Sequence, residues 1–207
     1  MRANVFVDAF NLYYGCLKGT RYRWLDLDVF CRQLLPRDHI HRIRYFTALV
    51  SGRSGDPQQP QRQQIYLRAL RTIPHLSVHL GHYLSHPVRM PLAHPPIVGP
   101  QTVEVIKTEE KGSDVNLASF LLLDGFRGDY EAAVVISNDS DLKVPIELVQ
   151  AELGLVVGVI NPHSPARRSR ALQPTFWRQV REPHLRSSQF PPILADARGM
   201  IRRPPGW

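Results

Sequence analysis

A chain of 207 residues with 43% hydrophobic and 21% charged side chains is long enough to bury a core and too apolar to be largely disordered. Lys and Arg number 26 against 18 Asp and Glu, and the formal net charge of +8 favours polyanionic partners such as nucleic acid. No apolar run approaches the roughly 20 residues that span a bilayer, so we expect no membrane segment.

The two cysteines, Cys16 and Cys31, come without a secretory signal, because Asp8 interrupts the first apolar run. Thiols in such a chain are usually reduced. We therefore expect free thiols and a cytoplasmic protein.

The first half of the chain alternates short apolar runs with amphipathic segments. The run that ends at Asp8 is rich in Val and Phe and predicts a buried strand, and Asn11 is the expected N-cap of a short helix behind it. The patterns that follow predict, in chain order, a helix, a strand, a helix and a strand: 26–35, 41–50, 61–73 and 75–84.

The second half begins with residues 85–101, which carry five prolines and predict an irregular insertion. Residues 102–107 are expected to re-enter the sheet as a short strand. A long helix is predicted over 112–126, with Ser113 as its N-cap. The last three predicted elements are a strand, a helix and a strand: 131–137, 142–153 and 153–161.

This alternation of strands and helices predicts the fold class. Two of the strands are almost continuous apolar runs, which is typical of a parallel sheet covered on both faces. We therefore predict a three-layer α/β domain with a central, mainly parallel sheet over residues 1–183, including the insertion at 85–101. The basic, Pro-rich tail at 184–207 is expected to lie extended over the body or to be partly loose.

Four aspartates stand where such a sheet binds ligands. Asp8 ends the first strand, Asp139 and Asp141 follow the strand at 131–137, and Asp114 opens a helix that begins near the same edge. Ligands bind at the carboxyl ends of the strands in open parallel sheets. The sequence therefore predicts that these carboxylates converge on one crevice.

Converging carboxylates require a cation. Two of them about 5 Å apart repel by roughly 3 kcal/mol at an effective dielectric of 20. Oxygen ligands without cysteine favour Mg²⁺ or Mn²⁺ over zinc, and such a site is typical of phosphodiester hydrolysis. The alternative is that each aspartate acts structurally, with Asp139 capping a helix and Asp114 interacting with a helix dipole.

Three segments resemble, in order and spacing, the motifs of the NYN domain family, which belongs to the PIN-like nuclease superfamily and includes LabA-like bacterial proteins. They are FVDAFNLYYG at 6–15, EKGSDVNLA at 110–118 and VVISNDSDLKVPI at 134–146. The resemblance covers roughly residues 3–162. It implies a three-layer α/β domain with a metal-dependent nuclease site, and RNA rather than DNA as the usual substrate class.

The resemblance also implies residue roles. Asp8 would be the metal ligand of the first strand, with Asn11 as its polar companion. Asp114 matches the aspartate of a KG-x-D motif, and Asp139 and Asp141 match an S-[GN]-D-x-D element. The implied catalytic set is thus all five residues, and the four aspartates are its Mg²⁺ or Mn²⁺ ligands.

The chain departs from the family pattern at Phe120. Many relatives carry an acidic residue six positions after the KG-x-D aspartate, and Phe120 occupies that position here. Asp124 does not replace it, because ten residues of helix span about 15 Å. Whether the site holds one or two metal ions is therefore left open.

Basic and aromatic side chains flank the predicted site. Lys111 precedes the helix that Asp114 opens, and three arginines follow the last predicted strand: Arg167, Arg168 and Arg170. We predict that these four residues bind a nucleic acid backbone, with a solvated basic turn as the alternative. Tyr13 and Tyr14 either stack on a base or pack in the core. The arginines of the first half are expected to be surface charge: Arg42, Arg44, Arg62, Arg68 and Arg71.

The sequence as a whole predicts a Mg²⁺- or Mn²⁺-dependent ribonuclease-type hydrolase. The alternative function is a non-catalytic nucleic-acid-binding or regulatory interaction module that retains the fold. A homodimer and an inhibitory protein partner both stay open.

Overall fold

The computed structural model describes residues 1–52 and 55–207. Its centre is a seven-stranded sheet with the order β4-β3-β2-β1-β5-β6-β7. Neighbouring strands pair in parallel except β3 and β4, which are antiparallel. This confirms the predicted mainly parallel sheet. The strands are β1 (Arg2–Asp8), β2 (His39–Ala48), β3 (Leu76–Pro91), β4 (Thr102–Lys111), β5 (Ala132–Ile136), β6 (Val156–Asn161) and β7 (Phe176–Gln179).

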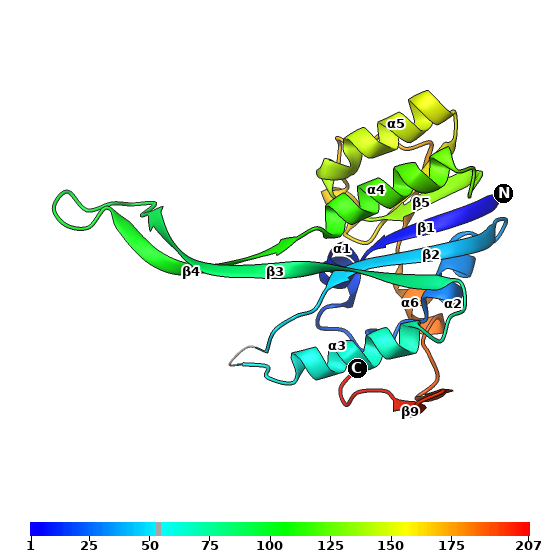
Figure 1. Ribbon diagram of the computed structural model, residues 1–207, viewed down its shortest axis with the longest axis horizontal. Coiled ribbons are helices and arrows are strands. Elements are labelled where there is room, and N and C mark those ends of the chain that lie inside the picture. The colour runs from blue at the N-terminus through cyan, green and yellow to red at the C-terminus, as the bar shows by residue number, and fades with distance from the viewer. Residues whose placement is uncertain (53–54) are drawn as a thin grey trace.

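Helices cover both faces of this sheet (Figure 1). The long helices α2 and α3 pack on one face, and α4 and α5 pack on the other. None of the helices in the described ranges is long and apolar enough to cross a membrane. The helical elements are α1 (Ala9–Leu12), the π-helical turn η1 (Tyr13–Leu17), α2 (Leu27–Leu34), α3 (Gln59–Leu70), α4 (Ser113–Phe126), η2 (Ser140–Leu142), α5 (Lys143–Leu153), η3 (Pro165–Arg167) and α6 (Glu182–Ser187).

The central strands are apolar on both sides because successive side chains point to opposite faces. In β1, Val5 and Val7 join the core under α2 and α3, whereas Phe6 joins the core under α4 and α5. In β5, Val134 and Val135 divide between the two cores in the same way. The near-continuous apolar runs of the sequence are the result.

The order of the strands places a topological switch between β1 and β5. The chain leaves β1 toward β2 and β3 on one side and later returns to β5 and β6 on the other. In open α/β sheets a ligand crevice forms at the carboxyl edge of such a switch. Asp8 is the last residue of β1, and Ser137 directly follows β5. The motif that contains Asp8 and the motif that contains Ser137 therefore lie at the switch.

Strands β3 and β4 form a long antiparallel arm that projects from the body (Figure 1). The prediction of an irregular insertion over 85–101 is wrong for 85–91, which belong to β3, whereas residues 92–101 form an irregular tip. Strand β3 pairs with β2 only as far as Gly81, so its outer edge is open beyond that point. Pro87 and Pro91 lie four residues apart and therefore direct their missing N–H groups the same way, which an open edge tolerates.

The tail packs against the body on the side of α2 and α3. It contains α6 and a hairpin of β8 (Ile193–Asp196) and β9 (Gly199–Arg202). Phe190 and Ile201 are buried in the core under those helices, and Arg68 of α3 forms an ion pair with Asp196 at 2.5 Å. The tail thus lies over the body, but with a helix and a hairpin rather than as an extended segment, and the boundary at residue 183 stays a prediction.

A buried ion pair joins α4 to the sheet. Arg44 of β2 donates from Nε to Oδ2 of Asp124 at 2.6 Å and from Nη2 to Oδ1 at 2.7 Å. The side chains are 11% and 2% exposed, so the expectation of surface charge is wrong for Arg44. Alternation explains this, because residue 44 of β2 faces the helix layer. The guanidinium also lies 4.4 Å from the ring centroid of Phe120.

We expect Asp124→Leu to lower the free energy of unfolding by about 3–5 kcal/mol, because it leaves the Arg44 charge buried without a carboxylate partner. The measurement is urea denaturation followed by circular dichroism. The double variant Arg44→Met/Asp124→Leu should regain much of the loss. Glu147→Gln, which removes the exposed ion pair with Lys143, is the matched control and should cost less than about 1 kcal/mol. A single variant as stable as this control would contradict the assignment.

Candidate active site

Asp8 is held from two sides at the end of β1. Its Oδ1 accepts a hydrogen bond from the backbone N–H of Asn11 at 2.9 Å, and its Oδ2 accepts one from Oγ of Ser137 at 2.9 Å. The side chain is nearly buried, at 6% exposure. Asp8 is thus the N-cap of α1, and the prediction that Asn11 is the cap is wrong. The cap residue must be extended, and the last residue of a strand meets that condition.

Asn11 connects the ends of three strands. Its Oδ1 accepts a hydrogen bond from the backbone N–H of Asn138, which follows β5, at 3.0 Å. It also lies 3.0 Å from Nε2 of His163, which follows β6. No sequence motif pointed to His163, although its place after a strand of a parallel sheet was an available signal.

The loop after β5 orders the next two aspartates. Ser137 Oγ accepts a hydrogen bond from the backbone N–H of Asp139 at 3.1 Å while donating to Asp8. Asp139 in turn accepts from the backbone N–H of Asp141 at 3.0 Å and caps η2, as the structural alternative proposed. Asp141 is exposed. One hydroxyl therefore fixes the spacing of Asp8 and Asp139.

Asp114 lies in the first turn of α4, next to a crowded junction with β3. Gly112 rather than Ser113 is the N-cap, and its φ of +97° is a conformation that favours glycine. Glu110 accepts hydrogen bonds from the backbone N–H and the Oγ of Ser113 at 3.2 and 2.8 Å. A Cβ on Gly81 would lie 2.5 Å from the backbone oxygen of Lys111, which cannot move aside as a side chain can, so only glycine lets β3 pass there.

The electrostatics show that the predicted aspartates lie close enough to interact. Burial raises the pKa of Asp114 to about 6, with further contributions from the charges of Asp8, Asp139, Glu110 and Asp141. Burial also raises the pKa of Asp8, and the charge of Asp139 adds to that effect. The charges of the other three predicted aspartates thus act on Asp114, together with that of Glu110, which directly precedes the Lys-Gly of its motif. That the four aspartates share one metal ion stays a prediction.

The donor set of this acidic cluster suits a hard cation. In the described residues, no three His, Cys, Asp or Glu side chains are spaced as a ready-made metal site. The available donors are carboxylate oxygens, and those of Asp8 keep free lone pairs beyond the hydrogen bond that each accepts. Mg²⁺ and Mn²⁺ bind oxygen donors, and Mg²⁺ often takes only one or two carboxylates and keeps several waters. The residues fit such an ion.

The basic residues that were predicted to bind nucleic acid flank the cluster unequally. Asn138 donates from Nδ2 to the carbonyl of Arg167 at 2.7 Å and accepts from the backbone N–H of Ser169 at 2.7 Å. These bonds tie the segment 167–170, which we call the arginine loop, to the acidic edge. Arg168 lies 5.1 Å from the ring centroid of Trp177. Arg167, Arg168 and Arg170 are exposed on that loop.

Lys111 is also exposed, but its Nζ lies 3.3 Å from Glu109. Its charge is partly offset, so Lys111 is a weaker candidate for a phosphate contact than the arginine loop.

Phe120, which stands where many relatives carry an acidic residue, lies in an aromatic stack. Its ring centroid lies 4.3 Å from that of His79 and 6.1 Å from that of Phe46. Phe120 of α4 therefore packs against β2 and β3, where it covers the buried Arg44 guanidinium. An apolar ring in this stack supplies no ligand to a cation.

The chain matches a known family and is similar to proteins of known sequence and structure. The model of the NYN domain matches residues 2–177. A relative from Pseudomonas putida (strain DSM 28022 / S16), named 6-hydroxy-3-succinoylpyridine 3-monooxygenase HspA, is 29% identical over 238 aligned residues, which cover 100% of this chain and 75% of the relative.

A crystal structure of a protein of unknown function from Vibrio parahaemolyticus RIMD 2210633 is also similar. The match covers 87% of this chain and 93% of the Vibrio chain, with a TM-score of 0.54 and 18% identity. At this identity the likeness concerns the fold alone.

We expect Asp114→Asn to stabilise the metal-free protein at pH 7.5. The pKa of Asp114 in the folded state, about 6, is above its ordinary value, so the folded state binds more protons and stability falls as the pH rises from about 4 to about 6. Removing the charge should relieve that loss. A gain of about 1 kcal/mol, discounted because Asp114 is partly exposed, corresponds to a rise in Tm of about 2–4 °C.

The measurement is thermal unfolding in EDTA at pH 7.5 and at pH 4. The difference between the variant and the parent should disappear at the lower pH, where both carry a neutral side chain at this position. A variant that is less stable than the parent at pH 7.5 would contradict the electrostatic reading.

Proposed function

Because the chain belongs to the NYN domain family, we propose that it is a metal-dependent nuclease that hydrolyses phosphodiester bonds of RNA. The observation that carries this proposal is the acidic cluster at the switch between β1 and β5. Burial and the charges of neighbouring carboxylates raise the pKa of Asp114 there to about 6, which is the expected result where carboxylates gather without a cation.

The proposed ligands of one Mg²⁺ or Mn²⁺ are Asp8, Asp114, Asp139 and Asp141. When bound, such an ion supplies Lewis-acid stabilisation of a phosphoryl oxygen and lowers the pKa of water. Phe120 contributes no carboxylate, and its ring is already occupied with Arg44 and His79. A single ion is therefore the simpler proposal.

The other residues of the site position these ligands. Asn11 and Ser137 hold Asp8 through its two oxygens, so the carboxylate keeps one orientation as charge develops on a bound phosphate. His163 fixes the Asn11 side chain in turn. Preorganisation of this kind is what a phosphoryl-transfer site requires, since its main task is to place charge.

The arginine loop and the net charge support a nucleic acid substrate. Arg167 and Arg168 belong to the loop that Asn138 ties to the acidic edge, and the charge of Arg167 lowers the pKa of His163 in addition to the effect of burial. We propose that these exposed guanidinium groups contact the phosphates of the strand. Cys16 and Cys31 are free thiols, which is consistent with the proposed cytoplasmic location.

A second candidate is oxygenation of an aromatic ring. The name of the Pseudomonas relative describes a monooxygenase of 6-hydroxy-3-succinoylpyridine, and at 29% identity it transfers no activity by itself. The observation that favours this candidate is a cavity with aromatic walls beside α1. Chromatography of 6-hydroxy-3-succinoylpyridine after aerobic incubation with the protein and a reductant tests it, and unchanged substrate removes it.

We expect Asp8→Asn to reduce cleavage of labelled single-stranded RNA in Mg²⁺ by at least about 100-fold, because a metal ligand loses its charge. Folding should persist, since Asn also accepts at an N-cap position. The assay compares Mg²⁺ with EDTA and uses Glu147→Gln on the exposed face of α5 as the matched control. Full cleavage by the variant would contradict the proposed role. A parent protein that shifts the RNA band without cutting it would favour the non-catalytic alternative.

We also expect Mn²⁺ to raise the Tm of the parent, because a cation bound only by the folded state stabilises it. At a free concentration 100 times the Kd the gain is about 2.7 kcal/mol. Asp139→Asn should weaken this response, and Asp28→Asn on α2, away from the site, should not. Equal Mn²⁺ responses in both variants would argue against a metal site at the cluster.

A further inference from the structure

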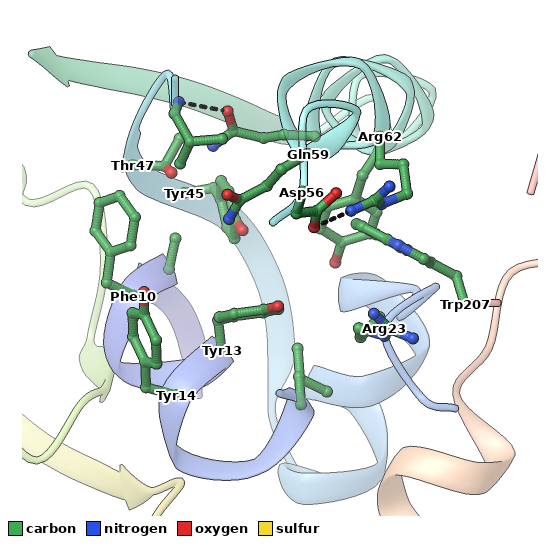
Figure 2. A pocket seen from close by; sticks show the side chains of 15 residues that line it. Phe10, Tyr13, Tyr14, Arg23, Tyr45, Thr47, Asp56, Gln59, Arg62 and Trp207 are labelled. Atoms are coloured by element: carbon green, nitrogen blue, oxygen red, sulfur yellow. Dashed lines mark hydrogen bonds and ion pairs between the residues drawn. The ribbon is translucent and has the colours of Figure 1, made fainter. Parts of the chain in front are cut away.

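A cavity of about 100 Å³ lies beside the acidic cluster, on the side of the sheet that α3 covers. Figure 2 shows Tyr13 from the turn after α1 and Tyr45 from β2 at this opening, with Arg23 and Trp207 along one side of it. We call it the aromatic cavity. Ala9, which also lines it, directly follows Asp8, so the cavity and the cluster are served by the same short helix.

The walls of the aromatic cavity are fixed by packing. The ring centroids of Tyr45 and Tyr66 are 6.4 Å apart, and those of Tyr66 and Trp207 are 5.7 Å apart. Tyr66 is 6% exposed and its hydroxyl donates to the carbonyl of Leu25 at 2.9 Å. A space of this size is comparable to an engineered cavity of about 150 Å³ that binds benzene. It therefore suits one six-membered ring.

The rim of the cavity carries an uncompensated positive charge. Arg62 forms an ion pair with Asp56, which Figure 2 marks with a dashed line. Arg23 donates from Nε to the carbonyl of Thr20 at 2.9 Å and from Nη2 to the carbonyl of Gly206, and its guanidinium lies 5.6 Å from the ring centroid of Trp207. Within residues 1–52 and 55–207, Arg23 forms no ion pair with a carboxylate. Arg23 can therefore bind an anionic group of a ligand.

The lining of the aromatic cavity therefore offers two kinds of contact. Aromatic rings form its walls, and the guanidinium of Arg23 stands at its rim without a carboxylate partner in the described part of the chain. Together they favour a planar ring that is linked to an anion.

We propose that the aromatic cavity binds one unstacked pyrimidine nucleotide, with the base against the aromatic walls and the phosphate on Arg23. Stacking of a base on aromatic side chains is the usual way in which proteins bind single strands. The choice of a nucleotide rests on the proposed nuclease function. Since Asp8 and Ala9 are adjacent, the cavity binds a base that neighbours the phosphate at the acidic cluster, and it gives the enzyme a preference for sites beside a pyrimidine.

The test is isothermal titration calorimetry in EDTA, so that no metal contributes. The probes are uridine 5′-monophosphate, ribose 5-phosphate and a short uridylate oligonucleotide. The variants are Arg23→Gln and Trp207→Leu, and the matched control is Arg127→Gln at the exposed end of α4. Circular dichroism confirms that each variant is folded.

We expect uridine monophosphate to bind, ribose phosphate to bind at least about tenfold more weakly, and both cavity variants to weaken binding by about tenfold or more while the control does not. An oligonucleotide that binds more tightly than the mononucleotide identifies a strand as the source of the base, and equal affinities identify a free nucleotide. Ribose phosphate that binds as well as uridine monophosphate, or an Arg23→Gln variant with unchanged affinity, overturns the proposal.

The Asp8→Asn variant separates this proposal from the nuclease function. Because Asp8 lies outside the cavity, its loss should leave uridine monophosphate binding unchanged while it abolishes cleavage. Binding at the cavity without any cleavage by the parent would remove the nuclease function alone. Cleavage by the parent without nucleotide binding at the cavity would remove the cavity proposal alone.

Discussion

The mutual repulsion of carboxylates at the carboxyl edge of β1 and β5 is the constraint on which the site depends. Asp8 and Asp139 both receive hydrogen-bond donors that hold them in place, and Ser137 links the two. A bound cation would remove this repulsion, which is why the proposed function includes a metal ion. The raised pKa of Asp114 reflects burial and the same repulsion.

The scaffold around the cluster is correspondingly rigid. Helix α4 presents Asp114 from its first turn and is attached to β2 near its other end by the Arg44–Asp124 ion pair. Where β3 passes the start of α4, glycine at position 81 avoids a side chain that would clash with the backbone oxygen of Lys111. The carboxylate of Asp114 is therefore positioned by contacts at both ends of its helix rather than by its own hydrogen bonds.

Helix α1 couples the acidic cluster to the aromatic cavity. Asp8 caps this helix, and the π-helical turn that continues it carries Tyr13 to the cavity wall. Trp207 of the tail closes the opposite side, so the tail contributes to a site as well as to the core. In the proposed enzyme a nucleic acid strand would place a phosphate at the acidic cluster and a base in the aromatic cavity, on either side of α1.

The sequence by itself determined the sheet, its two helical layers and the edge at which Asp8 and Asp139 meet. This was possible because parallel strands buried on both faces must be continuous apolar runs, and because the residues that follow such strands share one edge. Asp114 was predicted at this edge by a separate argument, because helices of this architecture begin near it. These features are local in sequence and repeat in a fixed order.

Only the tertiary structure decided which partners surround those residues. That Asp8 rather than Asn11 caps α1, and that His163 and Glu110 join the site, depends on distances between segments that lie far apart in the chain. The arm of β3 and β4 was missed because proline has no backbone N–H and is tolerated in a strand only where that missing donor faces an open edge. Only the order of the strands in the sheet reveals such an edge. The aromatic cavity was out of reach of any local pattern, since Tyr66 and Trp207 meet only when the tail folds back over α3.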